Sequence, residues 1–465
     1  MQKFHLSPQS YPNQRNPELR RHDFAEIYEA YSNAKAADQA ERCLQCGVPF
    51  CSVHCPLHNN IPDWLRAVAE GNLHDAYLLS SATNNFPEIC GRVCPQDKLC
   101  EGNCVVERGF GSITIGSVEK YITDNAWNEG WVQPFAPSHE RPQSVGIIGS
   151  GPAGMAAAQQ LRQAGFQVHI YDRYDRAGGM MIYGIPNFKL EKDIVLRRHQ
   201  QYEQSGVVFH FGVQVGENCT LKELQNRHDA ILIATGVYQA RNLEIAGDNL
   251  KNVHHALPYL TNSTREILGD NIDGAVNANA KDVVVIGGGD TAMDCVRTAI
   301  RQGANSVRCL YRRTQENMPG SAREVKNAID EGVQFEWLTS PIQLLGNSQV
   351  EAIEVQQMQL SPSTASGRRD VEPIQGSNRI ISTNMVITAL GFEAEDLPIM
   401  FGAPELKVRK GGTIRINHHN MMSSVDGVFA AGDIVRGSSL VVWAIADGRN
   451  AATHIQNYIL NQTKP

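Results

Sequence analysis

Two stretches of the chain share a pattern that restricts the fold more than any other feature. Residues 144–172 read SVGIIGSGPAGMAAAQQLRQAGFQVHIYD, and residues 282–313 read DVVVIGGGDTAMDCVRTAIRQGANSVRCLYRR. Each begins with an apolar β-branched run, continues through a glycine turn into an alanine-rich helix, and ends in a second apolar run. Strands that alternate with helices in this way are typical of βαβ units around a parallel sheet. The sequence therefore predicts an α/β protein with two Rossmann-like dinucleotide-binding units.

The first unit carries the full G-x-G-x-x-G spacing in Gly149, Gly151 and Gly154. Gly149 permits a tight turn, Gly151 lets the backbone approach a pyrophosphate, and Gly154 allows the helix to pack closely on the strand. Asp172 ends the second strand, where its carboxylate would accept hydrogen bonds from a ribose. Glycines at a helix entry can be simple packing residues, but here strand, helix and acid are in register. We therefore expect this unit to bind a dinucleotide.

The second unit has the variant G-x-G-x-x-A, with candidate binding residues Gly287, Gly289, Asp290 and Thr291. Its second strand ends in Arg312 and Arg313, where the first unit has an acid. A carboxylate at that place suits a free 2′-hydroxyl, whereas a guanidinium pair suits a 2′-phosphate. The alternative is that both arginines are solvated surface residues. The position favours NADP(H) over NAD(H).

A third apolar run, GVFAAGD (427–433), ends in Gly432 and Asp433. This order of motifs resembles that of two-dinucleotide-binding flavoproteins, in which the corresponding Asp bonds the ribityl chain of FAD. The runs 230–236 and 385–392 resemble the strands on which such chains cross between their FAD and NADP domains. The first unit is therefore expected to bind FAD, and Gly179 is a further candidate cofactor-binding residue.

Eight of the eleven cysteines lie within residues 43–104, at spacings C-x2-C-x4-C-x3-C-P and C-x3-C-P-x4-C-x3-C. The other three fall in strand or helix patterns and are interpreted as small buried hydrophobic residues. The clustered cysteines are candidate metal ligands, and they are Cys43, Cys46, Cys51, Cys55, Cys90, Cys94, Cys100 and Cys104.

Composition limits what these thiols can do. The N-terminus has no apolar signal-peptide core, and no apolar run reaches the ~18 residues of a membrane span. A cytoplasmic location is therefore expected, where structural disulfides are rare. The net charge of −7 gives no basic face for nonspecific nucleic-acid binding. We expect no membrane and no nucleic-acid partner.

Three uses of the thiols remain to be weighed: structural zinc, disulfide exchange and iron–sulfur ligation. Structural zinc usually uses two C-x2-C knuckles, and only one is present. A disulfide-exchange site of the thioredoxin reductase kind would place C-x-x-C in or beside the NADPH unit, where there is none. Closely spaced thiolates followed by proline fit iron–sulfur ligation best, and eight of them would hold two 4Fe–4S clusters.

The predicted ranges are a helical iron–sulfur domain at 1–140, FAD-binding parts at 141–243 and 386–465, and an inserted NADPH-binding domain at 244–385.

Several stretches carry a closer resemblance. CLQCGVPFC, CGRVCPQDKLCEGNC, ITIGSVEKYI, YGIPNFKLEK and ENMPGSAREVKNAIDEGV resemble the small-subunit family of NADPH-dependent glutamate synthases, from about residue 20 to the C-terminus. The same module resembles the N-terminal half of dihydropyrimidine dehydrogenase and the large subunits of NADH-dependent ferredoxin:NADP oxidoreductases.

The resemblance implies an NADPH-dependent oxidoreductase that serves as an electron-input subunit. NADPH would reduce FAD, and two 4Fe–4S clusters would pass single electrons to a large FMN-containing subunit in a hetero-oligomer. That partner would make L-glutamate from L-glutamine and 2-oxoglutarate. Because cofactors carry the redox steps, no catalytic side-chain constellation is expected. The alternatives are an electron-input subunit of another system and a non-enzymatic metal scaffold with vestigial nucleotide folds.

The resemblance to dihydropyrimidine dehydrogenase also implies an interleaved ligand set. One cluster would take Cys43, Cys46, Cys51 and Cys104, and the other would take Cys55, Cys94 and Cys100. Its fourth ligand is open between Cys90, which completes the cysteine count, and Glu119. Glu119 aligns with a place where that enzyme uses a side-chain oxygen of glutamine, and we favour it.

Overall fold

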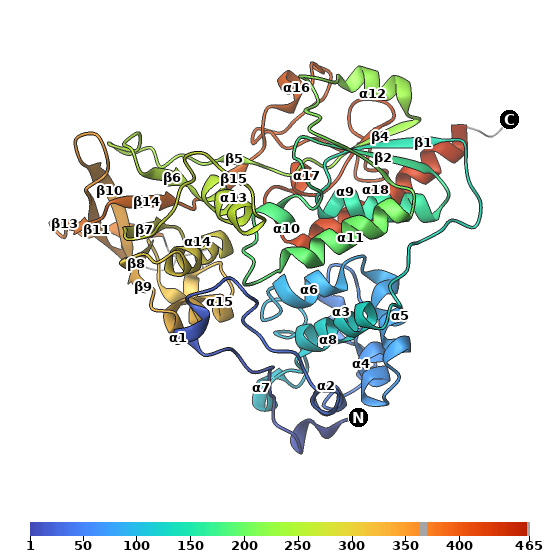
Figure 1. Cartoon of the computed structure of the whole chain (residues 1–465), viewed down its shortest axis with the longest axis horizontal. Helices are drawn as coiled ribbons and strands as arrows, with labels where there is room; N and C mark the ends of the chain where they lie inside the picture. Colours follow the sequence, from blue (N-terminus) through green and yellow to red (C-terminus); the bar gives the residue numbers. More distant parts are fainter. Residues whose placement is uncertain (362–369, 463–465) are drawn as a thin grey trace.

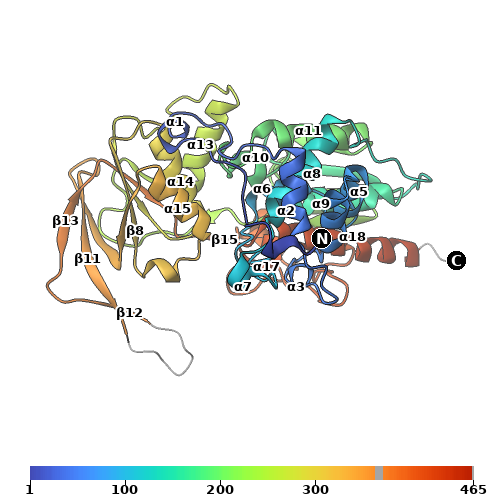
Figure 2. The same ribbon diagram turned by 90° about the horizontal axis from the view of Figure 1, so that it is seen from below.

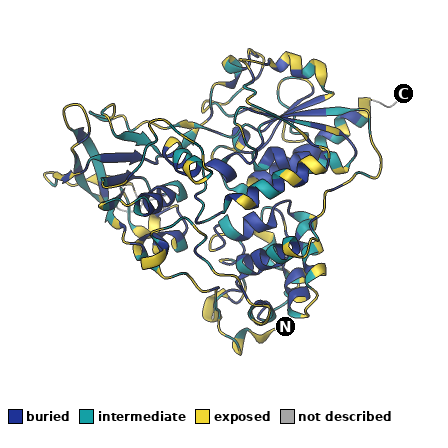
Figure 3. Cartoon of the chain, in the orientation of Figure 1, coloured by how far each residue is buried: buried dark blue, intermediate teal, exposed yellow. Residues whose placement is uncertain are grey.

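The computed structural model describes residues 1–361 and 370–462. Figure 1 shows three bodies around a common centre, with the N-terminal helices below, one sheet-containing unit at the upper right and another at the left. Figure 3 shows that the strands of both sheets are largely buried. In the described part of the chain, no helix combines the length and the apolar character needed to cross a membrane.

The N-terminal unit consists of short helices around one apolar core. In α4 (Ile61–Ala69), buried residues recur at helical spacing at Ile61, Trp64, Leu65 and Val68, so one face of the helix lies in the core. Burying each such side chain contributes about 1.5–3 kcal/mol. The other helices of this unit are η1 (Lys3–His5), α2 (Asn33–Glu41), α3 (Phe50–Val53), α5 (Leu73–Thr83), α6 (Pro87–Val93), α7 (Glu107–Phe110) and α8 (Ile115–Asn128). Helix α1 (Pro17–Arg20) instead lies beside the second sheet unit (Figure 1).

The first sheet unit is a parallel five-stranded sheet in the order β16-β4-β1-β2-β3. Helices α9 (Pro152–Gln163) and α18 (Val441–Gln462) pack closely on each other because Gly448 faces Ala153, where a Cβ would lie 2.1 Å from the Ala153 carbonyl oxygen. The strands are β1 (Ser144–Ile148), β2 (Gln167–Asp172), β3 (Val208–Phe211), β4 (Ala230–Ile233) and β16 (Val428–Ala430), and the helices are α9 (Pro152–Gln163), α10 (Met180–Tyr183), α11 (Lys192–Gln204), α12 (Leu221–Arg227), α16 (Leu397–Met400), α17 (Asp433–Arg436) and α18 (Val441–Gln462).

The second sheet unit repeats the parallel design in the order β6-β14-β7-β8-β9 and adds an antiparallel sheet of β10 to β13. Its strands are β6 (Val253–His255), β7 (Asp282–Ile286), β8 (Ser306–Tyr311), β9 (Gln334–Trp337), β10 (Thr339–Leu345), β11 (Ala352–Leu360), β12 (Val371–Pro373), β13 (Arg379–Ser382) and β14 (Met385–Thr388). Its helices are α13 (Ala256–Ile267), α14 (Asp290–Arg301), η2 (Gln315–Asn317) and α15 (Ala322–Asp330). Figure 2 shows the antiparallel sheet at the outer edge of this unit, away from the N-terminal helices.

The chain leaves the first sheet after β4 and returns to it at β16, so the second unit is inserted into the first. The two crossings pair as a short antiparallel ribbon of β5 (Gln239–Ala240) and β15 (Phe392–Glu393). The boundary predicted after residue 385 needs a correction, because β14 pairs with both β6 and β7 in the second sheet. We therefore place the return to the first unit after Thr388. The other predicted boundaries stay as proposals.

Buried ion pairs fix the three bodies against one another. Arg198 of α11 donates two hydrogen bonds to Glu88 of α6, at 2.6 and 2.8 Å, and joins the N-terminal helices to the first sheet unit. Arg20 of the N-terminal segment donates to Glu331 of the second sheet unit at 2.9 Å, and both side chains are fully buried. Buried charges held in this way are costly to separate, because removing one partner leaves the other unpaired.

Candidate cofactor cavity and cysteine pockets

The first glycine loop has the shape that its sequence predicts. Gly149 has a φ of 106°, and a Cβ there would lie 2.5 Å from the Ala234 carbonyl oxygen, so only glycine fits. A Cβ on Gly154 would lie 2.0 Å from the Gly149 carbonyl oxygen. Gly151 instead faces open space and caps α9, which leaves its backbone accessible to a ligand. These contacts leave an open cradle at the N-terminus of α9, which is the arrangement that suits a phosphate group.

Asp172 holds this loop from the end of β2. Its Oδ2 accepts hydrogen bonds from the Ser150 backbone N–H at 2.7 Å and the Ser150 hydroxyl at 2.5 Å, and its Oδ1 accepts from the Tyr174 N–H at 2.9 Å. The carboxylate also lines the cavity described next. The residue is thus placed both to shape the glycine loop and to accept a further hydrogen bond from a ligand there.

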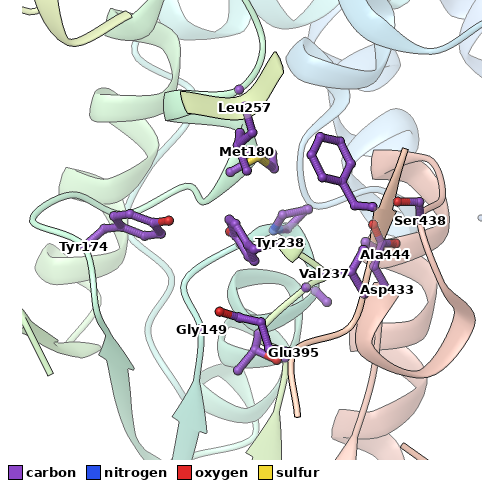
Figure 4. Close-up of a pocket in the computed structure, with 18 of the residues that line it drawn as sticks. Gly149, Tyr174, Met180, Val237, Tyr238, Leu257, Glu395, Asp433, Ser438 and Ala444 are labelled. Atoms are coloured by element: carbon purple, nitrogen blue, oxygen red, sulfur yellow. The ribbon is translucent and has the colours of Figure 1, made fainter. Parts of the chain in front are cut away.

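A cavity of about 570 Å³ lies between the two sheet units and is lined by both glycine loops. This volume is within the usual range of cofactor sites. Figure 4 shows Tyr174 on one side of the cavity, with Asp433, Ser438 and Ala444 on the opposite side. Burial raises the pKa of Asp433, whose Oδ1 accepts a hydrogen bond from the Ser439 hydroxyl at 2.5 Å. The cavity-lining residues predicted from the sequence are Gly149, Gly151, Asp172, Gly289, Asp290, Thr291 and Asp433.

The structure adds a polar residue that the sequence reasoning missed. Thr235 lines the cavity, and its buried hydroxyl has no hydrogen-bond partner among the described residues. A buried hydroxyl without a partner costs free energy, and a polar ligand atom in the cavity would remove that cost. The run AILIATG predicts only a crossing strand, and nothing in it marks this hydroxyl as part of a cavity. With the open cradle at Gly151, this hydroxyl makes the cavity a good fit for a dinucleotide.

Two predicted glycines support the loops without lining the cavity. Gly179 has a φ of 54°, and a Cβ there would lie 2.9 Å from the Gly151 Cα. Gly432 has a φ of 78°, and a Cβ there would lie 2.9 Å from the Ala153 Cβ. Both therefore let other backbone segments approach the cradle.

The second glycine loop repeats the construction. A Cβ on Gly287 would lie 2.4 Å from the Ala389 carbonyl oxygen, whereas Gly289 faces open space at the start of α14. Arg312 and Arg313 directly follow β8. Arg312 is exposed and Arg313 is half-buried, and neither guanidinium makes a hydrogen bond or ion pair with a described residue. Both are available to an anionic group beyond the end of β8.

The clustered cysteines separate into two pockets. The outer pocket is lined by Cys43, Cys46, Cys51 and Cys104, and the inner pocket by Cys55, Cys90, Cys94, Cys100 and Glu119. This is the grouping that the resemblance implies, and it brings both candidates for the last ligand to the same pocket. No three His, Cys, Asp or Glu side chains within residues 1–361 and 370–462 converge as the ligands of a single metal ion do.

The large cavity, the inner pocket and the outer pocket are neighbours in that order. Ile115, the first residue of α8, lines both cysteine pockets. Val442 of α18 lines the inner pocket, and its neighbours Val441 and Ala444 line the large cavity. The inner pocket thus lies between the cavity and the outer pocket, with a single apolar residue or helix turn on each side.

Burial controls the chemistry of these side chains. It raises the pKa of Cys51 to about 12, of Cys55 to about 11 and of Glu119 to about 8. Glu119 Oε1 accepts hydrogen bonds from the amides of Asn59 at 3.0 Å and Asn84 at 3.1 Å. Thiols in such surroundings ionise when a metal stabilises the thiolate. The donor set therefore fits iron–sulfur ligation.

The remaining cysteines, Cys219, Cys295 and Cys309, are buried in the apolar cores of the two sheet units. This confirms their interpretation as small hydrophobic residues.

Comparisons with known proteins agree with both halves of this arrangement. Residues 20–131 match the family "dihydropyrimidine dehydrogenase domain II, 4Fe-4S cluster", and residues 143–448 match "pyridine nucleotide-disulphide oxidoreductase". Among solved structures, FprA of Mycobacterium tuberculosis in complex with NADPH aligns with a TM-score of 0.59 at 20% identity, over 69% of this chain and 85% of that one. Thioredoxin reductase of Lactococcus lactis aligns with a TM-score of 0.51 at 19% identity, over 69% of this chain and 99% of that one. These likenesses show the two-unit fold.

Full-length relatives are much more similar. The NADPH glutamate synthase small chain of Azospirillum brasilense is 56% identical over 97% of this chain and 94% of its own. The small chain of Escherichia coli K12 is 41% identical over 96% of both chains. The putative oxidoreductase AegA of the same organism is 40% identical over 95% of this chain, which spans 68% of that protein. With this identity over nearly its whole length, the chain belongs to the family of NADPH glutamate synthase small chains.

Proposed function

We propose that this chain is the electron-input subunit of an NADPH glutamate synthase, located in the cytoplasm. When bound, FAD takes a hydride from NADPH and releases single electrons to two 4Fe–4S clusters. Those electrons reach a large FMN-containing subunit that forms L-glutamate from L-glutamine and 2-oxoglutarate. The observation that carries the proposal is the series of sites: one cavity lined by both glycine loops, then the inner pocket, then the outer pocket.

A separate set of residues would bind each of the two dinucleotides. Gly149, Gly151, Asp172 and Asp433 would hold FAD, with Thr235 as a further donor. The loop from Gly287 to Thr291 would hold the NADPH pyrophosphate at the N-terminus of α14. The cavity walls would shield the reacting atoms of both ligands from water, which favours hydride transfer.

The arginine pair would select the coenzyme. A charge-assisted hydrogen bond contributes about 1.5–3 kcal/mol, which is roughly ten- to a hundredfold in affinity. Replacing Arg312 and Arg313 by alanine should therefore weaken NADPH far more than NADH, as measured by kcat/KM with a dye acceptor. Equal losses for both coenzymes would show that the pair does not bind the 2′-phosphate.

The clusters would be held as the pockets group the side chains. Cys43, Cys46, Cys51 and Cys104 would hold the outer cluster, and the three cysteines Cys55, Cys94 and Cys100 with Glu119 would hold the inner one. Glu119 is preferred to Cys90 because its Oε2 makes no hydrogen bond with a described residue while Oε1 is anchored by two amides.

Exposed apolar residues surround the outer pocket and mark the exit to the partner. Val48 is 64% exposed, Phe50 48%, Val53 53% and Val105 50%, and Phe50 and Val105 line the pocket itself. An apolar patch of this kind is typical of a protein interface. We infer that the large subunit covers it and brings its own redox centre near the outer pocket.

An assay of the purified chain, with and without the large subunit, tests the proposal. It should reduce a dye with NADPH, and it should form no glutamate from glutamine and 2-oxoglutarate until the large subunit is added. Glutamate formed by the chain alone would contradict the proposal.

A second function has some support, because AegA, a putative oxidoreductase, is similar over nearly the whole of this chain. The chain would then supply electrons to another enzyme. Identifying the protein that co-purifies with it from native extract distinguishes the two.

A further inference from the structure

Two loops from different bodies of the molecule meet beside the inner pocket. The cluster-side loop, Gln96–Lys98, lies between the pocket cysteines Cys94 and Cys100. The nucleotide-side loop, residues 319–323, lies between η2 and the first turn of α15 in the second sheet unit. The two loops are more than 200 residues apart in sequence, yet each side chain of the cluster-side loop bonds to the nucleotide-side loop.

Two exposed side chains make the outer part of this contact. Lys98 Nζ donates to the Pro319 carbonyl oxygen and, at 2.9 Å, to the Gly320 carbonyl oxygen. Asp97 accepts from the Ser321 hydroxyl and the Ala322 N–H, both at 3.2 Å. Together they engage four successive residues of the nucleotide-side loop, three through the backbone and Ser321 through its hydroxyl.

A third side chain carries the contact to the pocket wall. Arg323 Nη2 donates to Gln96 Oε1 at 2.5 Å. The other end of this buried amide, Gln96 Nε2, donates to the carbonyl oxygens of Cys90 and Gly91, both at 3.2 Å. Gln96 itself lines the inner pocket. Movement of the nucleotide-side loop therefore reaches the backbone of α6 that presents Cys90 and Cys94.

The nucleotide-side loop is joined equally directly to the second glycine loop. The Gly320 N–H donates to the Gly288 carbonyl oxygen at 3.0 Å, and the Ser321 N–H donates to Asp290 Oδ1 at 3.0 Å. Pro319 lines the large cavity next to Gly289 and Asp290. A pyrophosphate at the start of α14 would touch the same residues that hold this loop.

We propose that Asp97 and Lys98 are positioning residues for the pyridine nucleotide, and that the two loops couple nucleotide binding to the redox state of the inner cluster. The inference rests on the proposed function, because it requires a nucleotide at the second glycine loop and a cluster in the inner pocket. Coupling between two sites is reciprocal. Nucleotide binding should therefore shift the midpoint potential of the inner cluster, and reduction of the cluster should change nucleotide affinity by the matching factor.

The test uses the full chain with its cofactors and a double variant, Asp97→Ala with Lys98→Met. Both side chains are exposed, so the variant should fold and retain its iron. Titration calorimetry with NADP⁺ on the oxidised protein should give a Kd raised about three- to tenfold, the loss expected for one or two hydrogen bonds. A redox titration followed by electron paramagnetic resonance should show that NADP⁺ shifts the inner-cluster midpoint less in the variant than in the parent protein, because the bond between Arg323 and Gln96 remains.

Two further variants separate positioning from general damage. Lys98→Arg alone keeps a cation within reach of the same carbonyl oxygens. This variant should therefore retain most of the parent's affinity for NADP⁺ and most of the NADP⁺-dependent shift in midpoint potential. Lys326→Met removes an exposed lysine of α15 that pairs with Asp330 on its own helix, and it should change neither measurement.

The outcomes are distinct from those of the proposed function. A parent protein that binds no NADP⁺ or holds no inner cluster would contradict the proposed function. A parent protein that binds both, together with a double variant that keeps the parent Kd and the NADP⁺-dependent shift, would overturn the coupling alone.

Discussion

Both cysteine pockets are formed by cysteines of the N-terminal unit, but the residues that surround them differ. The outer pocket is lined by four thiols and opens toward the exposed side chains of Phe50 and Val105. The inner pocket is lined by four thiols, a buried carboxyl group and the amides of Asn59 and Asn84, and it is adjacent to the large cavity. The outer site is thus apolar and near the surface, and the inner site is polar and enclosed.

This difference in surroundings would affect the reduction potentials of the two clusters and the order in which electrons pass through them. Cluster potentials depend on net charge, on hydrogen bonds to the ligands and on solvent exposure. With the ligand set proposed above, the inner cluster would differ from the outer one in the last two, because the amides of Asn59 and Asn84 donate to its carboxylate ligand and its pocket is lined mostly by buried residues. The pocket beside the cavity would therefore take electrons from the flavin, and the pocket at the surface would release them.

The largest expected effect comes from removing an outer thiol. Cys51→Ala should lose one cluster, which is about half of the iron, because a methyl group cannot replace a thiolate ligand. Dye reduction with NADPH should persist, since the cavity is untouched, while glutamate formation with the large subunit falls to background. Iron analysis and both assays check this, with Cys219→Ala as the control that changes neither. Retention of glutamate formation would show that electrons leave by another route.

The next effect decides the inner ligand set. Glu119→Ala should lose the inner cluster and a similar share of iron, whereas Cys90→Ala should keep it. Iron analysis together with electron paramagnetic resonance of the reduced protein compares the two variants. If Cys90→Ala loses the iron and Glu119→Ala retains it, the inner pocket has four thiolate ligands like the outer one, and the contrast between them is reduced to solvent exposure.

Sequence reasoning reached most of this comparison because the relevant patterns are local. The βαβ units, both glycine loops and the cysteine spacings each lie within about thirty residues, where strand, turn and helix preferences act directly. The boundary predicted after residue 385 cuts through the strand Met385–Thr388, since a short buried apolar run gives no signal about which sheet it joins.

Contacts between distant segments were not predictable in the same way. Thr235 becomes informative only when the fold places its hydroxyl in a cavity without a partner. The bonds from Gln96, Asp97 and Lys98 to the nucleotide-side loop join residues that no sequence pattern relates. The grouping of Cys104 with Cys43 came from resemblance, since spacing alone would allow several partitions of eight thiols.

A moderate effect is expected at the apolar rim of the outer pocket. Phe50→Ser with Val105→Ser should weaken binding of the large subunit about ten- to a hundredfold, because two large apolar contacts are lost. Iron content and dye reduction should not change. Leu78→Ser, which alters an equally exposed apolar residue of α5, is the matched control for the binding measurement. If only Leu78→Ser weakens binding of the large subunit, the interface lies at α5 and not at the rim of the outer pocket.

The smallest effect is a matched pair of shifts in potential. Gln45 Nε2 donates to Cys43 Sγ at 3.3 Å in the outer pocket, and Asn84 Nδ2 donates to Glu119 Oε1 at 3.1 Å in the inner pocket. A hydrogen bond to an anionic ligand stabilises the reduced cluster, so its loss should lower the midpoint. With about 0.5–1.5 kcal/mol for each bond, the shift is roughly 20–65 mV for one electron.

Each substitution should act on one cluster only. Gln45→Asn shortens the amide beyond reach of Cys43 and suits the positive φ of 54° at this position, so it should lower the outer midpoint alone. Asn84→Ala should lower the inner midpoint alone, because it removes a bond to the ligand that distinguishes that pocket. Redox titrations of both variants, followed by electron paramagnetic resonance, resolve the two signals. An Asn84→Ala protein with unchanged potentials would show that Glu119 does not ligate the inner cluster, and Cys90 would then complete it.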